Sequence, residues 1–386
     1  MQITFFSFIM SLLWFNLYIV IINNFRKNDK FIISFSTFPL IFFLALSVFR
    51  LIFSFDNPSS LIISSREIFP RIYDFMRRPL KLEVFSMDIF QLLILVWVTV
   101  AIVLVVANTI KYRDFKKGLK KLYESRNKRN EESFREILSL KGKGEKIRVI
   151  QHDSISSPFI IGIGKGVIYL PNTNLSREEM EYIISHEVNH FLANDSLKKI
   201  LVQMIKYVFW WNPFSHLFAN NFNHILEIQC DLRTTADFSD QEKIAYLEAI
   251  TSVINNQTED MKRYESIPNL INIRDIDSLK QRFRIVLNYK NKRNLFKVFN
   301  LALSALAVSF FIGSYFVIIQ PHYDPINAEE YIEGDKAESF IIENPDGNYD
   351  VYINSIYQYS IKTLEDLNES LSDMPVYEGA RQNDSK

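Results

Sequence analysis

Four long runs of apolar residues decide what this chain can fold into. They lie near residues 3–22, 31–53, 89–110 and 298–319. Each run is long enough for a helix of about 20 residues to cross the hydrocarbon core of a bilayer. Formal net charge is +0, from 44 basic and 44 acidic residues, but the charged residues are concentrated between the runs. The pattern predicts a membrane protein with four transmembrane helices and polar domains attached to them.

The ends of the runs predict how the chain crosses the membrane. The first begins MQITFFSF, without a basic segment or an A-x-A cleavage site, so we expect a retained anchor. KYRDFKKGLKKLYESRNKRN follows the third run and is strongly basic, so this side is expected to be cytoplasmic. The acidic PHYDPINAEEYIEGDKAESF follows the fourth run, and both termini would then lie outside. The loop at 55–87 fits less well, because it is basic and would also lie outside.

These spans divide the chain into four expected parts. They are a three-helix membrane region (1–110), a cytoplasmic domain (111–297), a fourth transmembrane helix (298–320) and a small extracytoplasmic domain (321–386). The small domain is expected to be α+β, with a hairpin in YDVYINSIYQYSI and one helix in LEDLNESLSDM.

The cytoplasmic part is expected to be mainly helical. KIRVIQHDSI and GVIYLPN predict two strands, a hairpin-like pair around the loop SSPFIIGIGK. A helix follows in LSREEMEYIISHEVNHFL, where Ser176 and Glu179 predict a capping box. Further helices are expected near residues 216–236, 241–256 and 275–290.

Two of the chain's 6 histidines occur in IISHEVNHFLAND. Residues four apart lie on one face of a helix, so His186 and His190 can bind one metal ion. Glu187 would then hold a water beside the metal and act as the catalytic base. The competing interpretation is a helix with two ordinary histidines.

HILEIQCDLRTT offers the third ligand that a catalytic zinc site needs besides an open position for water. Glu227 is the predicted ligand, and Asp231, one turn later, could orient a ligand histidine. Alternatively, both carboxylates lie on a solvated helix face. The single cysteine, Cys230, excludes an intramolecular disulfide and a multi-cysteine zinc site, and we expect it to be a small buried residue.

Between the two motifs lies ILVQMIKYVFWWNPFSHLF, whose apolar part is too short to cross a bilayer. Trp210 and Trp211 suit a membrane interface, and Asn212-Pro213 should end a helix. The segment is either a helix on the inner leaflet or a helix of the domain core.

Four motifs occur in this order along the chain: SSPFIIGIGKGVIYLP, SHEVNHFLAND, WWNPF and EIQCD. On these four motifs the chain resembles the BlaR/MecR-type membrane zinc peptidases, which are the bacterial β-lactam sensor-transducers and their relatives. The likeness covers roughly residues 1–320. It implies a gluzincin-like peptidase domain, Zn²⁺ bound by His186, His190 and Glu227, and Glu187 as the base. It also implies a bacterial cell membrane, and proteolysis of the chain itself or of a DNA-binding repressor.

Residues 321–386 depart from the best-known members of that family. They contain neither the S-x-x-K nor the K-T-G motif of a penicillin-binding domain. A β-lactam sensor is therefore not expected, and an unidentified extracytoplasmic ligand or partner would engage this part.

A zinc centre of this kind lowers the pKa of a bound water, whose proton Glu187 would accept. The strand GVIYLPN could pair with an extended substrate at its edge. The group that stabilises the oxyanion stays open among His216, His224, Arg233 and several tyrosines.

Two other functions fit parts of the pattern. One is a different membrane zincin for protein quality control, which would not explain WWNPF or the strand pair. The other is a non-proteolytic receptor with a structural zinc site, which would not need Glu187. The basic stretch after the third run is expected to meet anionic membrane lipid, and direct contact with nucleic acid is not expected.

Overall fold

The computed structural model describes residues 5–55, 60–65, 67–81, 86–124, 134, 136–138, 146–155, 157–162, 164–172, 175–260, 276–289, 293–321, 339–344, 347–353, 356–364 and 374–378. The chain forms two compact units, Met1–Ile63 with Met76–Ile319, and Ser64–Phe75 with Gln320–Lys386.

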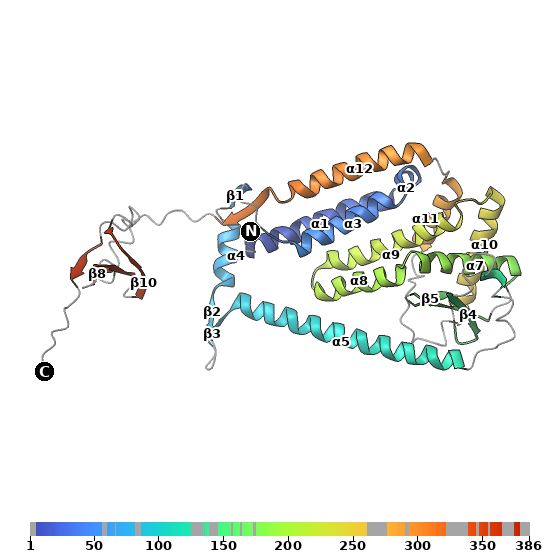
Figure 1. Ribbon diagram of the computed structural model, residues 1–386, viewed down its shortest axis with the longest axis horizontal. Coiled ribbons are helices and arrows are strands. Elements are labelled where there is room, and N and C mark those ends of the chain that lie inside the picture. The colour runs from blue at the N-terminus through green and yellow to red at the C-terminus, as the bar shows by residue number, and fades with distance from the viewer. Residues whose placement is uncertain are drawn as a thin grey trace. The chain divides into compact units, whose positions relative to one another are not determined.

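The first unit is mainly helical (Figure 1). Its helices are α1 (Phe5–Lys27), α2 (Asp29–Phe35), α3 (Phe38–Ile52), α5 (Ile89–Glu124), α7 (Arg177–Leu192), α8 (Asp195–Val208), α9 (Pro213–Thr234), α10 (Asp240–Asp260), α11 (Ile276–Asn288) and α12 (Arg293–Gly313). Its strands include β2 (Pro79–Lys81), β3 (Ser86–Asp88), β4 (Ile147–His152), β5 (Phe159–Ile161) and β6 (Gly166–Pro171), while β1 (Leu61–Ser65) and β7 (Val317–Pro321) begin in it.

Two helices of the described chain, Phe6–Lys27 and Ile89–Glu124, are long and apolar enough to cross a membrane. The second predicted span is not one straight helix, because α2 and α3 meet at an angle of 100°. Ser36 has a left-handed φ of 64° at the break, and Pro39 lies in the first turn of α3. Proline lacks the N–H that a continuous helix would need there, so it begins a new helix. If the bent pair is counted as one span, the number of candidate spans rises to three.

The third and fourth runs also differ from the prediction in extent. The third predicted span and the basic segment after it, as far as Glu124, form one continuous helix, α5, of 36 residues. The rest of the basic segment lies outside the described residues. The apolar part of α12, Val298–Gly313, is shorter than a full span, and the chain enters β7 at Val317. The fourth transmembrane helix therefore stays a prediction.

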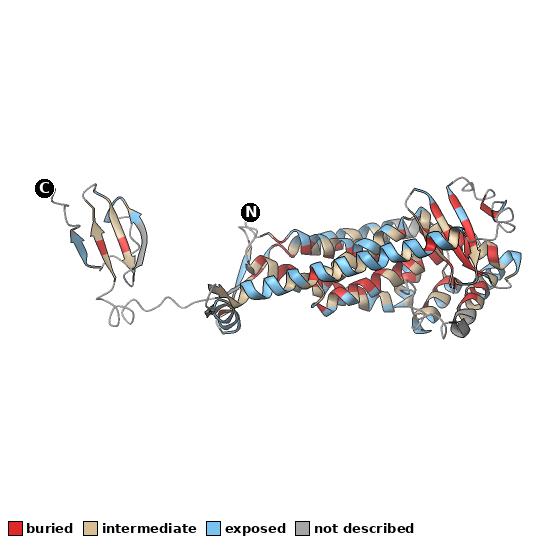
Figure 2. Ribbon diagram, turned by 90° about the horizontal axis from the view of Figure 1, so that it is seen from below, coloured by how far each residue is buried: buried red, intermediate tan, exposed pale blue. Residues whose placement is uncertain are grey.

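Helix α9 packs directly against α1 and α3. One hydrophobic core joins Phe15 and Ile22 of α1, Leu44 of α3, and Phe218 and Ile225 of α9, all nearly inaccessible to solvent. In Figure 2 the buried residues of this unit lie where its helices face one another. The helix that carries Glu227 thus shares its core with the helices predicted to enter the membrane.

The segment between the two motifs forms α8 and a tight turn into α9. Val202 of α8 is buried in the common core, whereas Leu197 and Leu201 are exposed. The indole N–H of Trp97 on α5 donates a hydrogen bond to the carbonyl of Val208 (2.5 Å). Helix α8 therefore buries one face in the core and exposes another apolar face. It combines features of the two predictions, a helix of the domain core and a helix on the inner leaflet.

The strand pairing differs from the predicted hairpin. The sheet has the order β4-β6-β5, with β4 parallel and β5 antiparallel to β6. The predicted hairpin of β4 and β6 is wrong, because the intervening segment contains β5, which returns the chain to form the antiparallel pair. Strand β6 is the central strand, and both of its edges pair with the described strands β4 and β5. The expected pairing of a substrate with β6 is therefore wrong, because β6 has no free edge in this sheet. The edge strand that packs against α7 is β5.

The predicted capping box of α7 is confirmed. The Ser176 hydroxyl accepts the backbone N–H of Glu179 (3.2 Å), and the Glu179 carboxylate accepts the backbone N–H of Ser176 (2.8 Å). Behind this cap, Ile183, Ile184 and Val188 pack against the sheet. The cap and the apolar stripe fix where α7 begins and which face it buries.

The second unit contains α4 (Ile68–Met76) and a four-stranded sheet of order β10-β9-β8-β11. Its strands are β8 (Phe340–Glu343), β9 (Tyr349–Ile353), β10 (Ile356–Ile361) and β11 (Val376–Glu378). YDVYINSIYQYSI forms the antiparallel pair β9–β10, whereas β11 pairs in parallel with β8, which sequence alone did not suggest. The helix predicted in LEDLNESLSDM lies almost entirely outside the described residues.

Candidate metal centre

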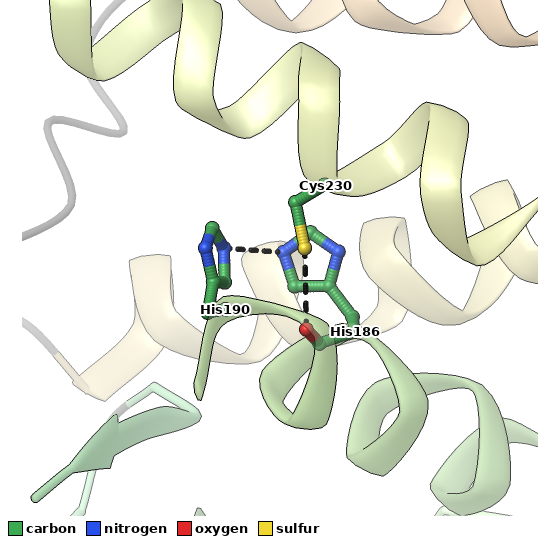
Figure 3. Close-up of side chains that lie close together, drawn as sticks. All are labelled: His186, His190 and Cys230. Atoms are coloured by element: carbon green, nitrogen blue, oxygen red, sulfur yellow. Dashed lines mark hydrogen bonds between the residues drawn. The ribbon is translucent and has the colours of Figure 1, made fainter. Parts of the chain in front are cut away.

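His186 and His190 lie one turn apart on the buried face of α7 (Figure 3). Their Nε2 atoms are 3.1 Å apart, and the two rings meet edge to face. Both side chains are directed toward α9, so they present two nitrogen donors to one point.

Glu227 of α9 reaches the same point. Its Oε2 lies 3.7 Å from Nε2 of His186 and 3.6 Å from Nε2 of His190. Donors of a tetrahedral zinc ion with bonds of about 2.1 Å are themselves about 3.4 Å apart. The three predicted ligands are therefore spaced as a single small metal ion requires.

Cys230, one turn after Glu227, adds a buried sulfur to this cluster. Ligand atoms of His186, His190 and Cys230 all lie within 4.8 Å of one another. The thiol donates a hydrogen bond to the carbonyl of His186 (3.2 Å). Sequence reasoning expected only a small buried residue here; the side chain is buried, and it also lies among the potential metal donors.

Glu187 is buried on α7 beside the two histidines. Among the described residues no hydrogen bond or ion pair engages its carboxylate. Its charge does interact with that of Lys199. A buried carboxylate is unfavourable unless other groups compensate its charge, and Lys199 does so in part.

Asp195 orients His190, a contact that sequence reasoning missed. Its carboxylate lies 2.8 Å from Nδ1 of His190, and Lys198 donates to its other oxygen (2.9 Å). Burial opposes ionisation of Asp195, but His190 and Lys198 outweigh it and lower its pKa. The left-handed Asn194 (φ 55°) at the start of α8 turns the chain back between His190 and Asp195. The only sequence signal was an aspartate soon after the second histidine.

Asp231 reaches His186 mainly through Tyr246. The Tyr246 hydroxyl lies 2.8 Å from Nδ1 of His186 and donates to Oδ1 of Asp231 (2.7 Å). Asp231 itself lies 3.4 Å from that nitrogen, and Arg282 binds both its oxygens (2.6 and 2.8 Å). Tyr246 and Arg282 come from α10 and α11, and no local pattern in the sequence pointed to them.

Two cations stabilise the charge of Glu227. Lys199 donates to its Oε1 (3.1 Å), and a nitrogen of Arg282 lies 3.6 Å from its Oε2. Burial opposes ionisation of Glu227, but Lys199 and His190 outweigh it and hold its pKa well below the usual range. Glu227 is therefore a carboxylate, the form that binds a metal ion.

Of the residues proposed for the oxyanion, the tyrosines include Tyr246, which contacts His186, whereas the two histidines and the arginine make other contacts or are exposed. His216 contacts the carbonyl of Trp210 (3.0 Å), and Arg233 is exposed. His224 contacts Gln281 (2.9 Å), not the donor cluster.

Comparison with known proteins shows which family this chain resembles. The model of the BlaR1 peptidase M56 family matches residues 32–286. The methicillin resistance mecR1 protein of Staphylococcus aureus is 28% identical over 116 residues, which are 29% of this chain and 20% of that protein. The regulatory protein BlaR1 of Bacillus licheniformis is 24% identical over 174 residues, 44% of this chain and 28% of its own length.

These curated relatives are longer, and the regions alike span 20% and 28% of them. The family match covers well over half of this chain and includes both helices of the donor cluster. The chain belongs to the BlaR1 peptidase M56 family of metallopeptidases.

Proposed function

We propose that this chain is a membrane zinc metalloendopeptidase that hydrolyses peptide bonds at the cytoplasmic face of a bacterial cell membrane. The observation that carries the proposal is the triangle of His186, His190 and Glu227, with edges of 3.1, 3.7 and 3.6 Å, beside the buried Glu187. Family membership and the two long apolar helices support it.

Two imidazoles and one carboxylate are a donor set typical of catalytic zinc. His186, His190 and Glu227 would hold the ion, which would supply a Lewis acid at the scissile carbonyl and the attacking water. Asp195 holds the ring of His190 by Nδ1, and Tyr246 holds that of His186. Such partners keep Nε2 of each ring directed at the ion.

Glu187 moves the proton in this proposal. Its carboxylate accepts a proton from the attacking water and then gives it to the nitrogen of the leaving amine. Among the described residues no hydrogen bond or ion pair occupies this carboxylate, although the charge of Lys199 acts on it. An extended substrate would pair with β5, the edge strand beside α7, and not with the central β6.

The biological setting is part of the proposal. One relative is named a regulatory protein, which supports a role in transmembrane signalling, with self-cleavage or cleavage of a transcriptional repressor as the reaction. The basic cytoplasmic end of α5 supports an inner peptidase domain and extracytoplasmic termini. The described tail, a small sheet, would receive the external stimulus.

One observation favours a second candidate function. Structural zinc sites use four protein ligands, and Cys230 lies near enough to complete such a set. The chain would then be a receptor with a structural zinc ion and no protease activity. The buried Glu187 has no role in that alternative.

Self-cleavage of the purified protein separates the two functions. Wild type and Glu187→Gln, in detergent with zinc, are compared on a gel, and bound zinc is measured on each. Loss of a general base slows proteolysis about 10²- to 10⁴-fold, while Glu187→Gln should retain zinc. Glu178→Gln, an exposed change in the first turn of the same helix, is the matched control. Equal fragments from wild type and Glu187→Gln would contradict the proposed protease.

A further inference from the structure

Two helices each carry a pair of potential metal donors, and both histidines of α7 lie near Cys230 and near Glu227 of α9. Helix α7 supplies His186 and His190, four residues apart, and α9 supplies Glu227 and Cys230, three residues apart. Both spacings place the two side chains of a pair on the same helix face. Figure 3 shows the sulfur of Cys230 directed from α9 toward the two imidazole rings of α7.

The proposed reaction uses only three of these four donors. Cys230 lies with His186 and His190 in a cluster whose ligand atoms are within 4.8 Å of one another. The thiol donates a hydrogen bond to the carbonyl of His186 (3.2 Å), and Cys230 also has side-chain hydrogen bonds with the imidazoles of His186 and His190. Thiols are weak donors, so these bonds leave the sulfur available to a metal ion held by the same two rings.

We propose that Cys230 is a fourth metal ligand that closes the centre in a resting form of the protease. The inference rests on the proposed function, because it uses the same centre of His186, His190 and Glu227. As the sulfur–metal bond forms, the thiol loses its proton to solvent and the water in the open position leaves. Opening reverses both steps: the sulfur–metal bond breaks, the thiolate is protonated and water returns.

The chemistry of the donors supports a closed form. Zinc binds thiolate well, and a site with four protein ligands leaves no position for water or substrate. The sulfur is buried with the histidines, so solvent competes little for the fourth position. One contact fixes this part of α9 against α7: Asn189 donates to the Thr234 hydroxyl (2.9 Å). Within α9, the same hydroxyl donates to the carbonyl of Cys230 (2.9 Å).

The packing of α9 shows how the centre could open. Phe218 and Ile225 of α9 share a core with Phe15 of α1 and Leu44 of α3. A displacement of the predicted membrane helices would therefore be transmitted to α9. Such a movement opens the centre if it shifts Cys230 away from the two histidines of α7 while Lys199 and Arg282 keep Glu227 in place. The loss of the sulfur ligand then opens the position that catalysis needs.

Cobalt(II) reports sulfur coordination directly, because a thiolate on cobalt(II) gives an intense near-ultraviolet charge-transfer band. The metal-free protein is titrated with cobalt(II) chloride in detergent, and the spectrum is recorded for wild type, Cys230→Ser and Cys230→Ala. The chain has 1 cysteine, so a band in wild type can come from Cys230 alone. We expect the band in wild type and its loss in both variants, with the visible bands of bound cobalt retained. Zinc-loaded Cys230→Ser should cleave itself several-fold faster than wild type.

The outcomes separate this inference from the proposed function. If wild type binds cobalt but shows no charge-transfer band, Cys230 is not a ligand, and the proposed centre of His186, His190 and Glu227 is unaffected. Failure of wild type to bind cobalt, with a spectrum like that of His186→Ala/His190→Ala, would overturn both. A band in wild type without faster cleavage by either cysteine variant would overturn the resting form.

Discussion

His224 connects α9 to the junction between α1 and α2 through one glutamine. Its Nε2–H donates to Oε1 of Gln281 (2.9 Å), and the Gln281 amide donates to the carbonyl of Arg26 (2.8 Å) and to Asp29 (2.8 Å). Burial, and then the charge of Arg26, lower the pKa of His224 to about 4. The folded protein therefore keeps this histidine neutral.

This histidine makes stability depend on pH. As pH falls below the ordinary value of 6.5, the unfolded chain binds a proton at His224 and the folded chain does not until about 4. Stability is therefore highest above pH 6.5 and falls toward pH 4, by up to about 3 kcal/mol. We expect the thermal midpoint of wild type to drop more between pH 7 and pH 4.5 than that of His224→Gln, whose amide can donate to Gln281. Parallel pH profiles of the two proteins would contradict the assignment.

The residue scale also shows what local spacing can and cannot predict. The proximity of His186 and His190 follows from helix periodicity alone. Tyr246 lies 60 residues from His186 in sequence and still contacts its ring nitrogen. Only tertiary packing brings α10 and α11 to this site, so no spacing rule could have identified Tyr246 or Arg282. The roles of His186, His190 and Glu227 as ligands stay predictions until a metal is measured.

At the scale of elements, the turn between α8 and α9 depends on Asn212. Its Oδ1 caps α9 by accepting the N–H of Phe214 (3.0 Å), and its amide donates to Asn16 of α1 (2.9 Å). The side chain is buried, so both bonds are shielded from water. One residue thus fixes the start of the helix that carries Glu227 and its position on α1.

Asn212→Ala should destabilise the protein by about 1–2 kcal/mol, because it removes a helix cap and leaves Asn16 without its donor. Hydrogen exchange in the first turn of α9 should increase in parallel, since the capped amide of Phe214 is released. Asn172→Ala is the control, because Asn172 is exposed and its amide donates an exposed hydrogen bond to Asp153 (2.6 Å). Its effect should stay within about 0.5 kcal/mol. An equal loss in both variants would show that the cap and the Asn16 contact contribute nothing particular.

Elements were predicted well where their signals are local. The capping box of α7 needs only Ser176 and Glu179, and it forms as expected. The pairing of β4 with β6 depends on where the chain between them goes, and the short β5 carries no clear alternation. The bend between α2 and α3 was not predicted. Pro39 lies in the first turn of α3, but in an apolar run a proline does not indicate whether it starts a new helix or kinks an existing one.

At the scale of the whole molecule, membrane orientation decides where the candidate centre works. Helix α5 continues from its apolar part into a basic end, so the side that contains Lys117 is expected to be cytoplasmic. The described apolar part of α12 is shorter than a full span. Whether α12 crosses the membrane determines on which side of it the tail lies. Orientation therefore tests the fourth span together with the location of the peptidase domain.

Single cysteines in a Cys230→Ser/Glu187→Gln background, which should not cleave itself, can measure this orientation in intact cells. We choose Lys117→Cys on the basic end of α5 and Tyr377→Cys in the tail, because both positions are exposed. A membrane-impermeant maleimide should label Tyr377→Cys in intact cells and Lys117→Cys only after permeabilisation. Leu95→Cys, in the apolar part of α5, should resist labelling in both conditions because lipid would surround it. Labelling of Lys117→Cys in intact cells would place the peptidase domain outside, and protection of both exposed positions would place the tail inside and exclude a fourth crossing.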